Sequence, residues 1–358
     1  MIATPTTAAG PAQAPAAAPP ADLDAALDRL RAIEAEIAAL VLGRDDTVRA
    51  ALLAVLARQH LALLGPPGTA KSQLVELLAE RLAPVPAAPG GPGGGLRCFV
   101  WLMTRYTTPD ELFGPIAPLE LKHNRYVRIT TNKLPEAEFA FLDEIFKANS
   151  AILNALLTIT HERAFDNGPE RVPVPLISLF GASNELPQGE DLGALWDRFL
   201  LRTVVEYVDD GDFARLLRLA AGATPPTTLP RADLLALQAA AAALPVPDGI
   251  VAALVQLRKD LAGRGIVASD RRWRHLLGVL RAYALLEGRA AVEEDDLIVL
   301  KDILWQAPEQ RQEIGRAAAR LANPLNARAV ELGDQAVGVY AAATDRQRDA
   351  DLGDEQKL

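Results

Sequence analysis

A short loop that ends in lysine and serine carries the clearest chemical signal in this sequence. An apolar run at 61–64 precedes the loop and periodic apolar residues resume at Leu74, which predicts a strand, a loop and a helix in that order. The backbone N–H groups of such a loop and of the helix start point at an anion. Lys71 would reach the β- and γ-phosphates of a nucleoside triphosphate, and the Ser72 hydroxyl would bind Mg²⁺. The candidate nucleotide-binding residues of this segment are Gly65, Pro66, Pro67, Gly68, Thr69, Ala70, Lys71, Ser72 and Gln73.

The loop departs from the pattern G-x-x-x-x-G-K-[ST] at one position, because Ala70 stands where the second glycine is expected. Alanine has a Cβ atom, so a positive φ at this position would cost on the order of 1 kcal/mol. We therefore expect Ala70 to have a φ that alanine adopts without strain.

Two later apolar segments end in polar residues that could complete the chemistry. The segment at 139–142 is followed by Asp143 and Glu144, and the segment at 176–182 is followed closely by Asn184. Asp143 at a strand end can hold Mg²⁺, and Glu144 can polarise the water that attacks the γ-phosphate. Asn184 could orient that water. In isolation these residues would be interpreted as a solvated acidic pair and a turn-forming asparagine, but the phosphate loop before them favours the catalytic interpretation.

The elements that must position these residues follow from the apolar pattern. Strands are predicted at 61–64, 99–102, 139–142, 176–182 and 201–208, and helical patterns lie between them. Asp22 is a predicted N-cap for a helix that runs to Leu40, and a second helix runs through 48–56. The sequence therefore predicts an α/β fold with a parallel sheet flanked by helices.

Composition divides the chain into four parts. Residues 1–21 form an Ala/Pro-rich tail that is predicted to be disordered, and 22–222 form the α/β nucleotide-binding domain. Prolines at 225, 226 and 230 precede an all-helical domain at 223–310, with helices expected at 234–244, 250–261, 272–286 and 295–304. Residues 311–358 form a helical extension with a charged, frayed end. The Gly/Pro-rich stretch at 84–95 is expected to be a flexible surface loop.

The composition also argues against several classes of protein. A formal net charge of −9 disfavours a constitutive nucleic-acid binder, whose surface would be basic. The single cysteine, Cys98, excludes an internal disulfide framework, and with four scattered histidines it shows no metal-ligand spacing. No apolar run approaches the roughly 20 residues that span a bilayer, and the N-terminus lacks the features of a secretory signal. A cytoplasmic location is therefore expected.

Several motifs in this order resemble those of the AAA+ P-loop ATPases. The phosphate loop, the Asp-Glu pair, the strand-end Asn and a later Asp197-Arg198-Phe199 all match, and the Ala before Lys71 is usual in the MoxR branch. The text WLMTRYTTPDELFG at 101–114, with similar stretches at 141–147, 152–157, 182–187 and 269–274, resembles the RavA subfamily. The similarity covers about residues 22–310 and implies an AAA+ domain with an all-helical lid. RavA-type chains usually continue into a small β-rich module, whereas only a helical stretch follows Pro308 here.

The resemblance implies further site residues. Arg198 resembles the arginine finger that reaches a neighbouring subunit's γ-phosphate, with Arg202 as the alternative. Arg271 resembles the second sensor arginine, which contacts the bound nucleotide from the lid, with Arg272 as the alternative. Gly43 and Arg44 resemble the segment that lines the adenine pocket. The stretch 119–131 resembles a hairpin insertion that would face a central pore or a client; its polar side chains are Lys122, Arg125, Tyr126 and Arg128.

The resemblance also implies a function. It suggests a homo-oligomeric, hexameric ATPase that uses ATP and Mg²⁺ to remodel a client protein, such as a metalloenzyme that needs cofactor insertion. The implied partner carries a von Willebrand factor A domain. Two other functions fit the same motifs: a nucleotide-gated assembly scaffold with little hydrolysis, and a nucleic-acid motor, which the acidic net charge disfavours.

Overall fold

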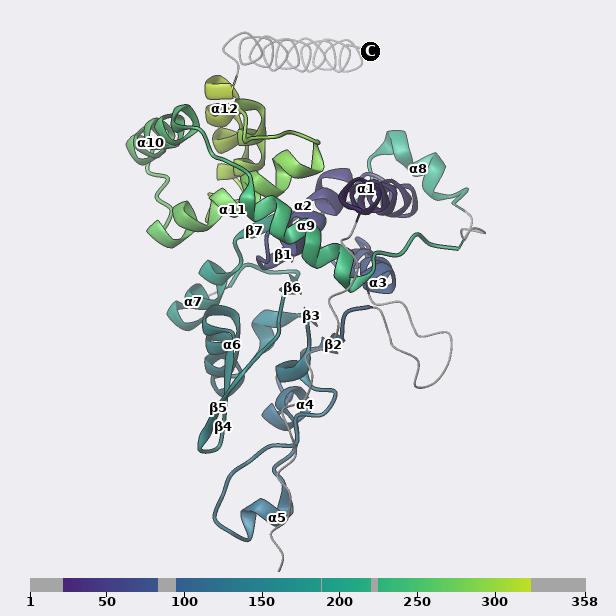
Figure 1. Ribbon diagram of the computed structural model, residues 1–358, viewed down its shortest axis with the longest axis vertical. Helices are drawn as coiled ribbons and strands as arrows, with labels where there is room; N and C mark the ends of the chain where they lie inside the picture. Colours follow the sequence, from purple (N-terminus) through teal and green to yellow (C-terminus); the bar gives the residue numbers. More distant parts are fainter. Residues whose placement is uncertain (1–21, 83–94, 188, 220–224, 323–358) are drawn as a thin grey trace, which may run out of the picture.

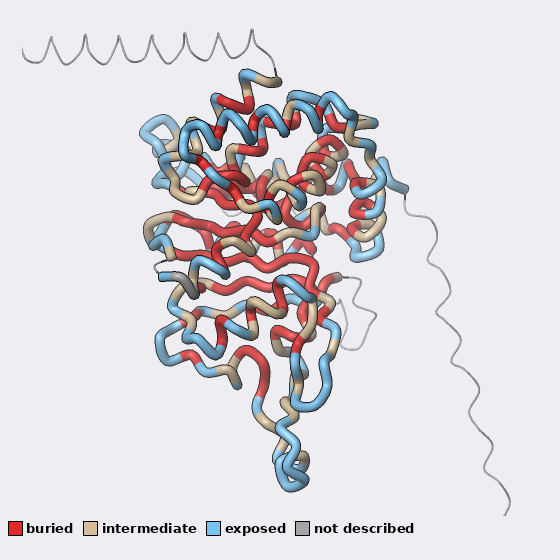
Figure 2. Tube along the Cα trace, turned by 90° about the vertical axis from the view of Figure 1, so that its left-hand side faces the viewer, coloured by how far each residue is buried: buried red, intermediate tan, exposed pale blue. Residues whose placement is uncertain are grey.

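The protein is described by a computed structural model covering residues 22–82, 95–187, 189–219 and 225–322 (Figure 1). The predicted tail at 1–21, the loop at 84–94 and the stretch 323–358 lie outside the described residues. A five-stranded sheet lies at the centre of the described chain, and buried residues are concentrated along it (Figure 2).

All five strands of this sheet are parallel, as the sequence predicts. They read as continuous apolar runs because a parallel sheet with helices on both faces buries alternate residues on each side. Leu61 at the start of its strand lies opposite Leu201, and Leu64 at its end lies opposite Ser183 and Val204. In spatial order the strands are β2 (Cys98–Leu102), β3 (Phe139–Asp143), β6 (Ser178–Ser183), β1 (Leu61–Leu64) and β7 (Leu201–Val204).

Two helices of the α/β domain begin at side-chain caps, and the cap at Asp22 is the one predicted from the sequence. Asp22 accepts a hydrogen bond from Ala25 N at the start of the first helix, and Asn149 caps α6 in the same way by accepting from Ile152 N. Helix α2 contacts β1 and β7, and α3 contacts β3 and β6. The helices are α1 (Leu23–Leu40), α2 (Asp45–Leu56), α3 (Lys71–Leu82), α4 (Pro109–Phe113), α5 (Pro118–Leu121), α6 (Ser150–Glu162), α7 (Glu190–Arg198) and α8 (Asp210–Leu216), with short 3-10 turns η1 (Leu134–Glu136) and η2 (Ile145–Lys147).

The region after 225 is helical throughout, and most of it gathers at one end of the molecule (Figure 1). The helix predicted at 295–304 is present over Glu294–Asp302, and it is a 3-10 helix. Its buried apolar residues, Leu297, Leu300 and Ile303, recur every three residues, which matches the three residues per turn of a 3-10 helix. The elements are α9 (Arg231–Ala243), α10 (Asp248–Gly263), α11 (Asp270–Leu286), η3 (Glu294–Asp302) and α12 (Gln310–Ala322).

The insertion predicted as a hairpin at 119–131 is not a β-hairpin. Pro118 begins the short helix α5, the chain then turns, and a single antiparallel bridge joins Ile116 to Arg128. The actual hairpin lies beside it in β4 (Ala164–Asn167) and β5 (Glu170–Pro173), where the Asn167 side chain donates to Arg128 O and accepts from Arg128 N. The insertion forms an exposed tip at the end of the molecule opposite the helical region (Figures 1 and 2).

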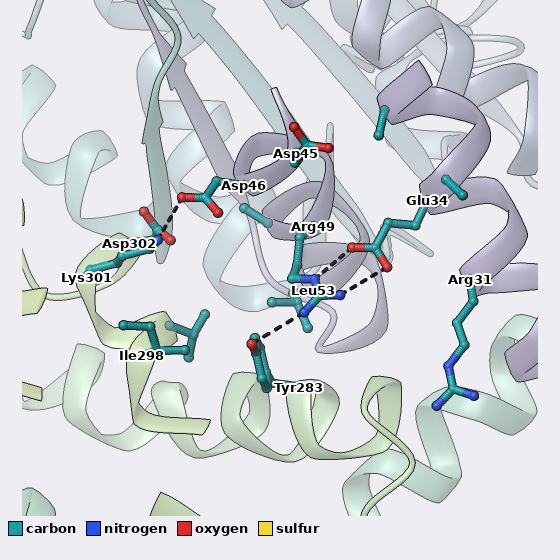
Figure 3. Close-up of a pocket in the computed structure, with 14 residues that line it drawn as sticks. Arg31, Glu34, Asp45, Asp46, Arg49, Leu53, Tyr283, Ile298, Lys301 and Asp302 are labelled. Atoms are coloured by element: carbon teal, nitrogen blue, oxygen red, sulfur yellow. Dashed lines mark hydrogen bonds and ion pairs between the residues drawn. The ribbon is translucent and has the colours of Figure 1, made fainter. Parts of the chain in front are cut away.

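The helical region is joined to the α/β domain by ion pairs, most of whose side chains are partly buried. Figure 3 shows the junction of α1, α2, α11 and η3, where a cavity of about 420 Å³ is lined by paired ions. Arg49 of α2 donates to Glu34 of α1 at 2.7 Å and to Glu287 after α11 at 2.6 Å. Lys301 of η3 donates to Asp46 of α2 at 2.7 Å. These pairs join the two parts of the chain on the side that also carries the N-terminal helices.

Candidate functional site

The phosphate loop connects β1 to α3, as its sequence predicts. Leu74 is the first residue of α3 whose N–H bonds back, to Ala70 O at 3.0 Å, so the N–H groups before it remain directed at the loop. The Lys71 ammonium lies inside the loop, donates to Gly65 O at 2.6 Å and Pro66 O at 2.8 Å, and leaves Lys71 only 9% exposed. Burial lowers the pKa of Lys71, and the carboxylates of Asp143 and Glu144 oppose that shift. Exchange of these carbonyl partners for phosphate oxygens would satisfy the ammonium.

The expectation that Ala70 avoids a positive φ was wrong. Its φ is +64°, in the left-handed region, together with Gly68 at +79°. The Ala70 side chain packs against the hydrophobic core. The chain therefore retains the conformation that a glycine would adopt at this position, and contacts of the Cβ atom offset part of its strain.

The residues predicted to hold Mg²⁺ lie in direct contact. Ser72 Oγ donates to Asp143 Oδ2 at 2.9 Å, which joins the first turn of α3 to the end of β3. A hydroxyl and a carboxylate are hard oxygen ligands of the kind Mg²⁺ prefers, and nucleotide phosphates and waters usually supply the rest of its shell. The described residues contain no cluster of three His, Cys, Asp or Glu that would form an all-protein metal site. The pair therefore fits Mg²⁺ bound together with a nucleotide.

Glu144 and Asn184 line one small cavity of about 180 Å³ next to the Mg²⁺ residues. They come from the ends of β3 and β6, which are neighbours in the sheet. Glu144 has a φ of +55°, a strained conformation of the kind that collects at functional sites. Its carboxylate lies 3.4 Å from the Lys147 ammonium, in the same cavity. A water held between the Glu144 carboxylate and the Asn184 amide would lie at the edge of the sheet where the γ-phosphate is expected.

A second cavity of about 200 Å³ lies on the other side of the phosphate loop, in position for the base. Arg44 lines it and is nearly buried; its guanidinium donates to Glu206 O and, at 3.5 Å, to Thr69 O, while Gly43 precedes it with a φ of +68°. Sequence reasoning missed α8, whose residues close this cavity together with Tyr207. The signal was Asp209, which caps α8 by accepting from Asp212 N. The apolar lining consists of Leu40, Val41, Leu42, Val208, Phe213, Leu216 and Leu219.

The predicted arginine finger and the predicted second sensor arginine lie at the opposite edge of the sheet. Arg198 ends α7 just before β7, whose first residue, Leu201, pairs with Leu61 at the start of β1. A four-residue strand is roughly 13 Å long, so the length of β1 separates this edge from the phosphate loop. Arg271, in the first turn of α11, lies beside Arg198 and Asp197. Its predicted contact with a bound nucleotide stays a prediction.

The alternative candidates, Arg202 and Arg272, are structural. Arg202 is fully buried, donates to Trp196 O at 2.8 Å and Phe199 O at 3.1 Å, and stacks over the Trp196 ring at 4.0 Å. Arg272 is also fully buried, and burial lowers its pKa to about 9. It donates to three carbonyls, those of Phe199 (2.9 Å), Leu200 (2.6 Å) and Ile303 (2.9 Å). Neither side chain is free to meet a nucleotide.

Arg198 and Arg271 belong to a wider basic cluster. One guanidinium nitrogen of each is buried without a hydrogen-bond partner among the described residues. Burial, and then the charges of Arg271 and Arg198, lower the pKa of His161 at the end of α6. Burial followed by Arg271 and other nearby cations does the same for His275. The cluster therefore concentrates positive charge that Asp197 offsets only in part, and this charge suits an anion from outside the chain.

Comparison with known protein families follows the two parts of the chain. A family model described as the MoxR domain of MoxR-vWA-beta-propeller ternary systems matches residues 28–233, more than half of the sequence. An AAA lid domain model matches residues 249–317. Within the described residues, no single helix is long and apolar enough to cross a membrane; the pair α9 and α10, bent by 83°, meets that test only when taken together.

Individual relatives agree with these matches. Two uncharacterized proteins of Methanocaldococcus jannaschii are 41% and 38% identical to the chain, covering 78% and 84% of it and 70% and 78% of their own lengths. Chaperone MoxR1 of Mycobacterium tuberculosis is 27% identical to the chain, and the match covers 75% of the chain and 72% of the length of MoxR1. A crystal structure described as a candidate ATPase from Cytophaga hutchinsonii has a TM-score of 0.64 and 18% identity, covering 84% of this chain and 96% of that one, and supports the fold.

Proposed function

The chain belongs to the MoxR family of AAA+ ATPases, and we propose that it is an oligomeric, Mg²⁺-dependent ATPase that couples hydrolysis to the remodelling of a client protein. The observation that carries the proposal is the 2.9 Å contact between Ser72 and Asp143 beside the buried Lys71 ammonium. A hydroxyl, a carboxylate and an ammonium gathered at a helix N-terminus suit a nucleoside triphosphate with its metal ion.

Within one subunit the roles follow the geometry of the site. Lys71 and the loop 65–73 would hold the phosphates, Gly43 and Arg44 would border the adenine, and Ser72 with Asp143 would bind Mg²⁺, which neutralises charge on the β- and γ-phosphates. Glu144 would take a proton from water as its oxygen attacks the γ-phosphorus and the bond to the ADP oxygen breaks, giving ADP and phosphate. Asn184 would hold that water in line.

Arg198 and Arg271 would complete the site of a neighbouring subunit. Their position at the edge opposite the phosphate loop supports action in trans, since one face of each subunit would then meet the other face of the next. Such a head-to-tail contact closes into a ring, and we propose a hexamer. Arg271 thus serves as the second sensor for the neighbour's nucleotide and acts together with the arginine finger.

The proposed partner carries a von Willebrand factor A domain, and the name of the matching family model supports this choice. The proposed client is a protein such as a metalloenzyme that needs activation or cofactor insertion, in the cytoplasm. The insertion at 119–131 would contact the client, because its tip exposes Leu119 and Tyr126. The closer resemblance to the RavA subfamily stays part of this proposal.

Affinity capture with Glu144→Gln tests the proposal. The substitution removes the base without removing the nucleotide-binding residues. The variant should therefore bind ATP, hydrolyse it very slowly and stay bound to its partner. We expect recovery of a von Willebrand A-domain protein from native lysate with ATP and not without it; Lys71→Ala, which should not bind ATP, is the matched control. Equal recovery in all three conditions, or no recovery in any, would contradict the partner proposal.

A further inference from the structure

We propose that Arg202 is a positioning residue that holds the arginine finger, Arg198, in place from the lid of its own chain. This inference rests on the proposed function, since it assumes that Arg198 acts on the γ-phosphate bound by a neighbouring subunit. Arg202 itself is fully buried and does not reach a nucleotide. It would act through the backbone that carries Arg198.

Arg202 binds the backbone on both sides of the finger. Its guanidinium donates to Trp196 O at 2.8 Å and to Phe199 O at 3.1 Å. The Phe199 N–H also donates to Trp196 O, at 3.2 Å, so these residues form one closed turn at the end of α7. Arg198 Nε is buried without a hydrogen-bond partner among the described residues. The direction of the Arg198 side chain therefore depends on the turn that Arg202 holds.

The same guanidinium binds the segment of the lid that follows η3. It donates to Trp305 O and, at 3.1 Å, to Gln306 Oε1. Gln306 is fixed in turn, because its backbone N–H donates to Gln310 Oε1 at 2.8 Å at the start of α12. A guanidinium carries five N–H donors in a rigid, planar fork. One side chain can therefore hold the finger segment and the lid segment at a fixed separation.

Two tryptophan rings enclose the guanidinium. Arg202 Cζ lies 4.0 Å from the centre of the Trp196 ring and 5.9 Å from that of the Trp305 ring. The two rings pack edge to face, with their centres 5.7 Å apart. Trp196 also packs on Phe146, at 5.9 Å, which lines the small cavity at the ends of β3 and β6. A shift of the lid against the sheet would therefore reach Arg198 through this packing.

Steady-state ATPase rates of the assembled protein test the inference. Arg202→Lys keeps the charge but loses the fork, so it should lower kcat roughly tenfold, as expected for a group displaced by less than about 1 Å. KM for ATP should not change, because Arg202 does not contact the nucleotide. Trp305→Phe removes an indole N–H that is buried without a partner among the described residues, and its smaller ring should lower kcat roughly threefold. Arg81→Lys, at a buried arginine in α3, controls for the exchange itself and should keep the wild-type kcat.

Mixed assemblies separate a defect of the finger from a defect of the subunit's own site. In an equal mixture with Lys71→Ala, which keeps its arginines, Arg202→Lys should recover to about a quarter of the wild-type rate. A quarter of the head-to-tail contacts then join an intact phosphate loop to a well-placed finger. In an equal mixture with Arg198→Ala, no contact has such a finger, and the rate should stay at or below about a tenth.

The opposite pattern, with recovery beside Arg198→Ala and none beside Lys71→Ala, would place the defect in the subunit's own site and overturn the inference. An unchanged kcat in both Arg202→Lys and Trp305→Phe would overturn it as well. If Arg202→Lys does not fold, Trp305→Phe goes through the same mixtures and should be more active beside Lys71→Ala than beside Arg198→Ala; equal rates would contradict the positioning role.

Failure of the proposed function gives different results. If Arg198→Ala alone keeps the wild-type rate, the finger assignment fails whatever the rate of Arg202→Lys. If the wild type hydrolyses ATP no faster than Lys71→Ala, the proposed ATPase activity fails. A low rate in Arg202→Lys beside active wild type and inactive Arg198→Ala, with the expected recovery beside Lys71→Ala, supports the inference.

Discussion

The Ser269 hydroxyl donates a 3.0 Å hydrogen bond to the Asp197 carboxylate and so ties the start of α11 to the end of α7. Arg271 lies two residues after this serine and Arg198 directly follows this aspartate, so the bond fixes both arginines in one unit. Arg272 strengthens the same junction by donating to Phe199 O and Leu200 O. An arginine pair held in this way should act on one nucleotide, that of the neighbour.

Mixed assemblies test whether this pair acts in trans. Arg198→Ala subunits and Lys71→Ala subunits should each assemble and lose most ATPase activity. Mixed in equal amounts, they should recover about a quarter of the wild-type rate, since a quarter of the head-to-tail contacts then join an intact phosphate loop to intact arginines. No recovery would contradict trans action by Arg198.

The matched control mixes Arg198→Ala with Arg271→Ala. If both arginines of one subunit serve the same neighbouring site, no contact in this mixture has both, and the rate should stay low. Recovery to about a quarter would instead show that Arg271 serves the nucleotide of its own chain.

Removal of the buried Arg272 should destabilise the protein far more than removal of an exposed arginine on the same helix. Arg272→Ala leaves the carbonyls of Phe199, Leu200 and Ile303 without their donor and opens a cavity. We expect a loss of about 3 kcal/mol or more in the free energy of unfolding, measured by urea denaturation. Arg274→Ala, in an exposed position, should change it by less than about 0.5 kcal/mol. Similar values for both variants would contradict the structural role of Arg272.

Sequence patterns predicted what depends on local order along the chain. The strands, the phosphate loop and the acids after β3 are of this kind, because a buried parallel strand and the turn after it are specified by consecutive residues. The spatial relation between Arg198 and Arg271 is not specified by consecutive residues. It depends on how the start of α11 packs against the end of α7, as in the Ser269–Asp197 bond, whose partners are 72 residues apart. The 3-10 geometry of η3 was not predicted, because short apolar repeats of three and of 3.6 residues are hard to tell apart.

Substitutions at Ala70 should show the cost of its left-handed backbone. Ala70→Gly relieves strain at a φ of +64°, offset by greater freedom of the unfolded chain, so stability should change by less than about 1 kcal/mol. ATP binding, followed by titration calorimetry, should persist in this variant. Ala70→Val should weaken it at least tenfold, because a β-branched residue tolerates this φ poorly and would deform the loop. Normal ATP affinity in Ala70→Val would contradict the backbone assignment.

The Ser72 and Asp143 pair predicts a specific loss on metal removal. ATP with Mg²⁺ should raise the melting temperature of the wild type, because a ligand that binds only the folded state stabilises it. EDTA should abolish most of this increase. In Ser72→Ala and Asp143→Asn, ATP should give the same small increase with and without Mg²⁺. A full Mg²⁺-dependent increase in Asp143→Asn would exclude this carboxylate from the metal site.

Asp302 should make the stability of the lid junction depend on pH. Burial raises the pKa of Asp302 to about 6 from its ordinary 3.8, although Arg311, whose guanidinium is 2.8 Å away, opposes the shift. Between these two values the folded state holds a proton that the unfolded state has lost, so the free energy of unfolding falls as the pH rises. A shift of this size corresponds to about 3 kcal/mol, lost between pH 4 and pH 6 and constant above that range.

Comparison with Asp302→Asn isolates this effect, because other titrating groups are shared by the two proteins. Urea denaturation from pH 4 to pH 7 should show the wild type losing about 3 kcal/mol relative to the variant, most of it below pH 6. Asp295→Asn changes an exposed position on the same helix, and its free energy of unfolding should change with pH as that of the wild type does. A wild type that gains stability relative to Asp302→Asn as the pH rises would mean that the ion pair with Arg311 outweighs burial and that Asp302 is charged throughout.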